Sequence, residues 1–169
     1  RYNDSLVNKT YIAKLEKDDK SSFVSNNLKN GKLTANIKLL GDYMIKVDSI
    51  PPTVNLIDVE NNQWISNKDK LQIKISDKNS GISSYRGTLN DKWILLEYNP
   101  MKGILTYDFD DNINNSEAKN ILKVNVTDNV GNAKLLEKVF FRTVKKWKIL
   151  YSFYCVLCTL LFFRKKVLL

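Results

Sequence analysis

Apolar and polar residues alternate along much of this chain before residue 142. Leu71, Ile73 and Ile75 alternate with polar neighbours, and the same period of two recurs at Leu122 and Val124. A period of two places successive side chains on opposite faces, so each segment predicts a strand with one buried and one solvated face. No strong helical period appears before residue 145, and the pattern therefore predicts an all-β fold.

Seven predicted strands follow residue 52, and turn-forming residues separate them. Their approximate bounds are 53–59, 70–76, 83–89, 92–98, 104–109, 121–127 and 134–142. The intervening segments are rich in Asn, Asp, Gly and Ser, which favour tight turns. Strands of this number and spacing predict an immunoglobulin-like β-sandwich. The 92–98 segment has too many consecutive apolar residues for simple alternation, which fits either a central strand buried on both faces or a bulged strand.

Pro51 and Pro52 mark the expected boundary between two parts of the chain. Consecutive prolines fix φ, remove two donors and hold the preceding residue extended, which makes a stiff joint. We therefore divide the chain into 1–47, 48–142 and 143–169. The first part has expected strands around 9–15, 22–25, 33–40 and 43–47. A segment of this length rarely buries enough surface to fold alone, so we interpret it as the C-terminal part of a preceding β-domain.

Charge is distributed unevenly, and the composition excludes several kinds of site. The net charge is +9, but residues 142–169 hold seven basic residues and no acidic one, so the rest carries only +2. A nucleic-acid interface needs basic residues concentrated on a folded face, so we expect no nucleic-acid partner. The chain has no histidine, which excludes serine–histidine triads and histidine zinc sites. We expect no catalytic, cofactor-binding or metal-ligating residue in this chain.

Two aspartate–glycine segments are candidate calcium loops or simple turns. They are Asp77–Gly81 and Asp128–Asn132, and Asp108, Asp110 and Asp111 would add carboxylates to a metal site. Calcium takes six to eight oxygen ligands, often from a dense run of acidic residues, and no such run is present. Aspartate side chains also accept hydrogen bonds from their own loop, and glycine permits positive φ. The sequence therefore favours structural turns over a metal site.

Aromatic and acidic residues offer two further candidates. Trp64, Trp93, Tyr85, Tyr98 and Tyr107 could form a platform that stacks on carbohydrate, but aromatic residues in half-buried strands more commonly pack in the core or along an edge. Asp110 and Glu97 could form a glycosidase pair, yet nothing in the sequence places them in one cleft. Packing is the favoured interpretation of the aromatic residues.

The tail contains an uncharged run over residues 149–163, with basic residues on both sides. As a helix it would span about 22 Å, against about 30 Å for a bilayer core. Snorkelling lysines and Trp147 at the interface would make up part of the difference. Three interpretations stay open: a short membrane anchor, a translated remnant with no selected role, and a partner-binding or interfacial helix. Cys155 and Cys158 lie inside this apolar run, which favours packing over redox chemistry.

An ordered series of residues gives the chain a family resemblance. The series runs through Gly41–Asp48, Pro51–Val54, Ser76-Asp77, Ser80–Ile82, Tyr85–Thr88, Lys92–Tyr98, Leu105–Tyr107 and Val126–Asn132. It resembles the C-terminal non-catalytic region of secreted lysostaphin-like zinc metallopeptidases from Bacteroidota, over about residues 22–142. The resemblance implies a parent peptidoglycan hydrolase in which a zinc endopeptidase domain precedes immunoglobulin-like modules. The family's zinc ligands are histidines and an aspartate of the catalytic domain, so no catalytic residue carries over.

These observations predict a non-catalytic accessory module of a secreted or cell-envelope metallopeptidase. Its expected role is to position or brace the catalytic domain of the parent chain. Peptidoglycan or a cell-surface protein is a further expected partner, and residues 149–163 would provide membrane contact if they form an anchor. The alternative is a stand-alone surface module that acts in adhesion or binds glycan.

Overall fold

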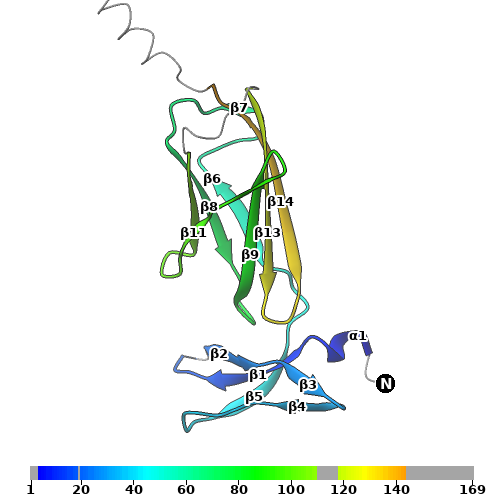
Figure 1. Cartoon of the computed structure of the whole chain (residues 1–169). Coiled ribbons are helices and arrows are strands. Elements are labelled where there is room, and N and C mark those ends of the chain that lie inside the picture. The colour runs from blue at the N-terminus through cyan, green and yellow to red at the C-terminus, as the bar shows by residue number, and fades with distance from the viewer. Residues whose placement is uncertain (1–3, 19, 110–117, 144–169) are drawn as a thin grey trace, which may run out of the picture.

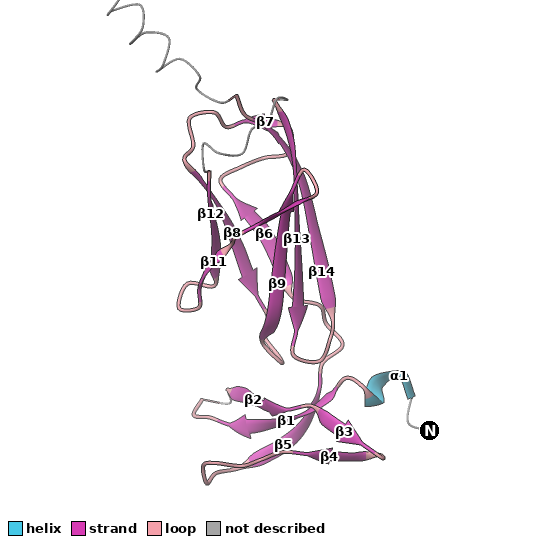
Figure 2. Cartoon of the chain, in the orientation of Figure 1, coloured by secondary structure: helices cyan, strands magenta, loops and turns pink. Residues whose placement is uncertain are grey.

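The computed structural model describes residues 4–18, 20–109 and 118–143, and almost all of its regular structure is β (Figure 2). The exception is the four-residue helix α1 (Asp4–Val7), which is too short to leave a periodic signal in the sequence. The strands form a small N-terminal sheet and hairpin, shown in blue to cyan in Figure 1, and a larger unit beyond them.

The larger unit is a β-sandwich made of two sheets. One sheet has the order β10 (Lys92–Ile94), β9 (Ile82–Leu89), β13 (Lys119–Asp128), β14 (Ala133–Phe141) and β7 (Gln63–Trp64). The other has the order β11 (Glu97–Asn99), β12 (Ile104–Asp108), β8 (Lys70–Ser76) and β6 (Thr53–Ile57). Neighbouring strands are antiparallel except β14 and β7. The division of strands between the sheets follows the immunoglobulin pattern, which confirms the predicted all-β sandwich.

The core lies between the two sheets and uses the faces that alternation predicted. Leu71, Ile73 and Ile75 of β8 are buried, and they face the buried residues Leu122 and Val124 of β13 across the sandwich. Burial of each such side chain contributes about 1.5–3 kcal/mol to folding. Because both inner faces are continuous and apolar, the sandwich has a core of its own.

The segment 92–98 differs from the prediction, because it is neither one central strand nor one bulged strand. It splits into β10 and β11, which lie at the edges of opposite sheets. Ile94 and Leu96 turn into the core, whereas Leu95 between them is exposed. The crossing chain passes close to Gly87, where a Cβ atom would lie 2.7 Å from Leu96 Cδ1. The apolar run therefore reflects a chain that crosses the open edge of the sandwich.

The N-terminal part contains a three-stranded sheet and a hairpin. The sheet has the order β2 (Ser21–Ser25), β1 (Thr10–Leu15) and β5 (Tyr43–Val47), and the hairpin pairs β3 (Asn27–Lys29) with β4 (Lys32–Thr34). The strand predicted over 33–40 is wrong in extent, because β4 ends at Thr34. Ile37 and Leu39 are 56% and 65% exposed. The alternating pattern continues there, but β4 pairs only with the short strand β3.

The N-terminal sheet lies against one end of the sandwich, where the β8–β9 and β13–β14 loops are found (Figure 1). The described chain leaves the sandwich at the opposite end, near Thr143. No helix in the described ranges is long and apolar enough to cross a membrane. The predictions for residues 149–163 and for Cys155 and Cys158 lie outside the described residues.

Candidate functional site

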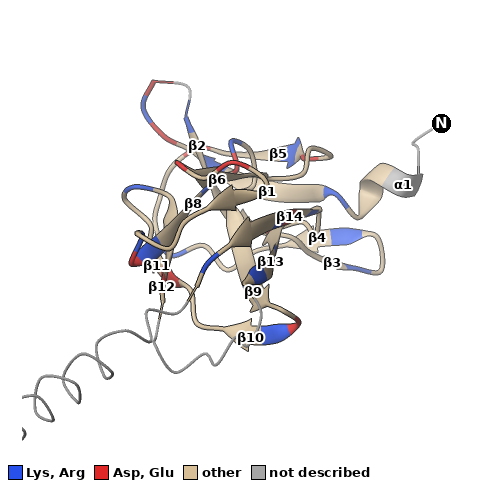
Figure 3. Cartoon of the chain, turned by 90° about the horizontal axis from the view of Figure 1, so that it is seen from above, with Lys and Arg blue, Asp and Glu red and all other residues tan. Residues whose placement is uncertain are grey.

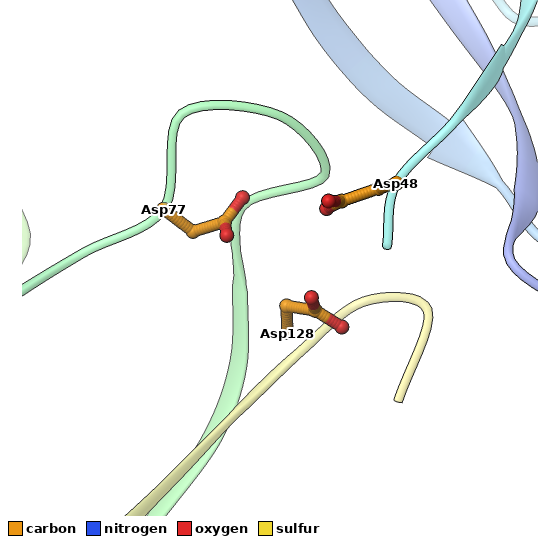
Figure 4. A group of neighbouring side chains, drawn as sticks. All are labelled: Asp48, Asp77 and Asp128. Atoms are coloured by element: carbon orange, nitrogen blue, oxygen red, sulfur yellow. The ribbon is translucent and has the colours of Figure 1, made fainter. Parts of the chain in front are cut away.

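Three carboxylates meet where the N-terminal sheet joins the sandwich. Asp48 follows β5, Asp77 follows β8, and Asp128 ends β13. One carboxylate oxygen from each residue lies within 4.8 Å of the other two. Figure 4 shows the three side chains pointing toward one another from three separate loops. We call these three residues the joint cluster.

Asp48 is fully buried and held by four hydrogen bonds. Its Oδ2 accepts bonds from Ser80 N at 3.1 Å and Ser80 Oγ at 2.6 Å, and its Oδ1 accepts bonds from Ile50 N at 3.0 Å and Asn79 Nδ2 at 3.1 Å. Desolvation raises the pKa of Asp48, but these hydrogen bonds together outweigh it and leave the pKa below its ordinary value. The charged form is therefore the stable form at neutral pH.

Asp77 and Asp128 each organise their own loop in the same way. Asp77 Oδ1 accepts bonds from Asn79 N at 2.9 Å and Gly81 N at 2.8 Å. Asp128 Oδ1 accepts bonds from Val130 N at 3.0 Å and Asn132 N at 2.7 Å. Gly81 has a φ of 81°, a conformation that favours glycine. Both segments are therefore the turns that the sequence predicted.

Two asparagines of the β13–β14 loop link the cluster together. Asn132 Nδ2 donates to Asp48 O at 2.9 Å and to Asp128 Oδ2 at 2.7 Å. Asn129 Nδ2 donates to Ser80 O at 2.8 Å, and Asn129 N donates to Gly81 O at 3.1 Å. The two loops and the joint therefore form one connected hydrogen-bond network.

The cluster concentrates negative charge, whereas the other charged side chains of the described residues are spread out. Lysines, aspartates and glutamates are scattered over both parts of the molecule (Figure 3). In the described residues the ion pairs are Lys14–Glu16 and Lys123–Asp91, so neither involves the cluster. Lys9 approaches the β13–β14 loop, where its Nζ donates to Val130 O at 3.0 Å. Like charges this close repel one another unless donors or a cation compensate them.

Tyr11 of β1 is 0% exposed and packs against Val130, which lies in the loop that follows Asp128. Its ring packs with Ala13, Val130 and Phe23, and its hydroxyl has no hydrogen-bond partner within the described part of the chain. Burial raises the pKa of Tyr11, and the nearby charges of Asp48 and Asp77 raise it further. The phenol is thus within electrostatic reach of two of the three carboxylates.

The cluster contains two of the five aspartates that the sequence offered as calcium ligands. Asp77 and Asp128 come together, whereas Asp108 is an exposed residue of β12 outside the cluster. Asp110 and Asp111 lie outside the described residues, so the pairing of Asp110 with Glu97 does as well. Sequence reasoning did not include Asp48 or Tyr11 in a site. The position of Asp48 just before the double proline is the signal that could have pointed to it.

The five candidate aromatic residues occupy different environments. Trp64 stacks on Phe141 with ring centroids 5.3 Å apart, and Tyr85 lies 5.6 Å from Tyr98. Tyr107 is buried in the core. Trp93 is 61% exposed and borders a hollow of about 360 Å³, which Glu97, Tyr107 and Asp108 also line. Packing therefore accounts for most of this set, and Trp93 is the member with an exposed face beside a hollow.

No protein-family model matches the chain, and no curated protein matches it. Similar solved structures include an endo-beta-1,4-mannanase from Thermotoga petrophila (12% identity, TM-score 0.47), over 57% of this chain and 20% of that chain. CopC from Methylosinus trichosporium OB3b is 12% identical with a TM-score of 0.39, over 53% of this chain and 93% of that chain. A mutant of the SrpA adhesin from Streptococcus sanguinis is also 12% identical with a TM-score of 0.39, over 57% of this chain and 60% of that chain.

The chain spans a fifth of the length of the mannanase chain. At this identity and these TM-scores, the likenesses assign neither a family nor a function to the chain.

Proposed function

We propose that this chain is a non-catalytic accessory module of a secreted or cell-envelope zinc metallopeptidase, and that it positions or braces the peptidase domain. The resemblance of residues 22–142 to the non-catalytic region of lysostaphin-like peptidases supports the parent class. One observation carries the mechanical role: Asp48 is bonded to the N-terminal part and to the sandwich at once. The proposed partners are the catalytic domain of the parent chain and peptidoglycan or a cell-surface protein.

Asp48 links the two parts through both its backbone and its side chain. Its N–H donates to Lys9 O of the N-terminal part at 3.0 Å, and its carboxylate accepts bonds from Asn79 and Ser80 of the sandwich. Pro51 and Pro52 follow after Ser49 and Ile50, and their rings restrict the backbone of the connection. The linker therefore has few free torsions through which the two parts could rotate.

Contacts away from the linker add resistance to bending. Asn26 Nδ2 donates to Asn129 O at 2.6 Å, and Lys9 Nζ donates to Val130 O. Tyr11 and Val130 also pack in one small apolar cluster. A single hydrogen bond contributes only about 0.5–1.5 kcal/mol. Contacts at separate points oppose rotation about more than one axis, so together they favour one orientation of the two parts.

The path of the chain suits a spacer. It enters the sandwich at the joint and leaves it at the far end, near Thr143 (Figure 1). A module connected at opposite ends sets the distance between the two parts that it joins, and a stiff joint also sets the angle between them. This geometry supports rigid placement as the mechanism.

The stiffness of the joint can be measured by electron–electron spin distances. Leu40 and Met101 are 99% and 97% exposed and lie in different parts of the molecule. Spin labels on Leu40→Cys and Met101→Cys, in a full chain with Cys155→Ser and Cys158→Ser, should give one narrow distance distribution. Asn132→Ala should broaden it. A broad distribution in the otherwise unchanged chain would refute rigid placement.

The parent class has a separate test, which is the coding sequence upstream of Arg1. A zinc motif with histidine ligands there is expected. Tandem sandwiches without such a motif would contradict the peptidase parent and favour an adhesion protein.

A glycan-binding role is the second candidate, and the hollow beside Trp93 favours it. An exposed indole next to Glu97 and Asp108 offers an apolar face and hydrogen-bond acceptors, the mixture that small-ligand sites use. In a sedimentation assay with insoluble peptidoglycan, Trp93→Ala should reduce binding and Trp64→Ala, at another exposed tryptophan, should not. Equal binding by both variants and the unchanged chain would exclude this hollow as the glycan-binding site.

A further inference from the structure

We propose that the joint cluster of Asp48, Asp77 and Asp128 binds one divalent cation, with Ca²⁺ as the best-fitting ion, and so fastens the N-terminal sheet to the sandwich. The fastening role rests on the proposed bracing function, whereas binding itself does not. The two ideas can therefore fail independently.

The spacing of the oxygens fits within the span of Ca²⁺ ligands. The three carboxylate oxygens lie within 4.8 Å of one another. Ca²⁺ ligands lie about 2.3–2.6 Å from the ion, so two of them can be up to ~5 Å apart, whereas Mg²⁺ at about 2.0–2.1 Å limits this span to ~4 Å. Ca²⁺ can thus bridge the cluster with little movement of the loops.

The existing bonds leave one oxygen of Asp77 without a hydrogen bond from the described residues, whereas both oxygens of Asp48 and both oxygens of Asp128 accept bonds. The turn bonds of Asp77 fall on Oδ1, and Asp77 Oδ2 accepts no hydrogen bond from the described residues. Asp128 likewise directs Oδ1 to its own loop and Oδ2 to Asn132. Because each loop is already ordered by these bonds, a cation need not order it on binding.

Tyr11 is an independent indication of a ligand at this place. Its hydroxyl is fully buried and has no hydrogen-bond partner among the described residues, and its side chain packs against Val130 of the loop that follows Asp128. Buried polar groups are nearly always paired, because an unpaired one is costly. Ca²⁺ commonly keeps water among its six to eight ligands, and a water on the ion could form a hydrogen bond with the phenol hydroxyl.

The charge balance of the joint also favours a cation. Asp48 and Asp128 are buried, Asp77 is half-buried, and the positively charged side chain nearby, Lys9, donates to a backbone carbonyl. A divalent ion would compensate carboxylates that come from the linker and from both loops. Its binding would therefore join three segments that are far apart in the sequence.

The test uses the full chain stripped with EDTA, and the probes are Ca²⁺, Mg²⁺ and Tb³⁺. At Ca²⁺ about 100-fold above its Kd, the melting temperature should rise by roughly 5–10 °C, and Mg²⁺ should have a smaller effect. Excitation of tyrosine should sensitise Tb³⁺ emission, because Tyr11 packs against the loop that follows Asp128. No calorimetric heat, no melting shift and no sensitised emission would overturn the proposal.

Matched variants separate this site from surface carboxylates. Asp77→Asn keeps an oxygen for the turn bonds but removes a charge, so it should fold normally and lose the Ca²⁺ response. Asp91→Asn removes an exposed carboxylate outside the cluster and should keep that response. Loss of the response in both variants, or in neither, would contradict the assignment. Tyr11→Phe should reduce Tb³⁺ emission.

Spin-distance measurements in EDTA and in Ca²⁺ distinguish the site from the bracing function. A narrow distribution with no Ca²⁺ binding would refute the cation site and leave bracing intact. Ca²⁺ binding with a broad distribution would refute bracing and support the site. A distribution that is already narrow in EDTA and narrows further on adding Ca²⁺ would support both.

Discussion

Replacing Asp48 with alanine should destabilise the protein more than the loss of a surface aspartate. The change removes an acceptor of four hydrogen bonds of 2.6–3.1 Å. Two of the donors belong to Ser80, which is buried. Each buried donor left unpaired costs about 1–3 kcal/mol. Relief of repulsion from Asp77 and Asp128 offsets part of this cost, so we expect a net loss of about 2–4 kcal/mol in the free energy of unfolding.

The measurement is urea and thermal unfolding of the full chain, followed by circular dichroism. For a chain of this size the expected loss lowers the melting temperature by roughly 5–15 °C. Asp48→Asn keeps part of the acceptor capacity, so its free energy of unfolding should lie between those of the original chain and of Asp48→Ala. Asp42→Ala, at an exposed aspartate, should change stability by less than about 0.5 kcal/mol. If Asp48→Ala unfolds like Asp42→Ala, the joint network does not stabilise the fold.

Two further predictions concern acid and the core. The pKa of Asp48 is lowered in the folded protein, so its stabilising contribution is complete above the ordinary value of 3.8 and is lost as the pH falls through the lower folded value. Unfolding free energies measured across this range should decline less in Asp48→Ala than in the original chain. Gly87→Val would place a Cβ atom 2.7 Å from Leu96 Cδ1, so urea unfolding should show a loss of about 1–3 kcal/mol or more.

Periodicity predicted the sandwich well because it reports which face of a strand is buried. The alternation at Leu71, Ile73 and Ile75 became a strand with the predicted bounds, 70–76. The same alternation at Ile37 and Leu39 did not, because strand formation also needs a partner, and β4 pairs only as far as Thr34. Pairing depends on distant residues, so a local pattern alone does not determine it.

The segment 92–98 shows a second limit of local patterns. Its apolar residues could fill a strand buried on both faces, or they could cross between two sheets. The chain crosses between the sheets because β10 and β11 lie at the edges of opposite sheets, and Gly87 leaves room for Leu96 of the crossing chain. Those features depend on the arrangement of both sheets, which residues 92–98 do not encode by themselves.

The joint cluster was predictable only in its local parts. Both aspartate turns follow from residue types within five positions of each other. Their meeting with Asp48 depends on tertiary contacts, such as the bond from Asn132 Nδ2 to Asp48 O across 84 residues. Sequence reasoning therefore identified two loops correctly, but it did not identify the third carboxylate or Tyr11.

The structure also changes how the two interpretations of Asp77, as a turn residue and as a metal ligand, relate to each other. A turn and a metal ligand are competing explanations only if they need the same oxygen. Asp77 uses Oδ1 for its turn, and Oδ2 accepts no bond from the described residues, so one side chain can do both. Asp77→Asn should therefore preserve stability in EDTA and lose the response to Ca²⁺, whereas Asp77→Ala should lose both. If the two variants are equally unstable in EDTA, the charge itself is needed for the turn, and the two roles cannot be separated at this residue.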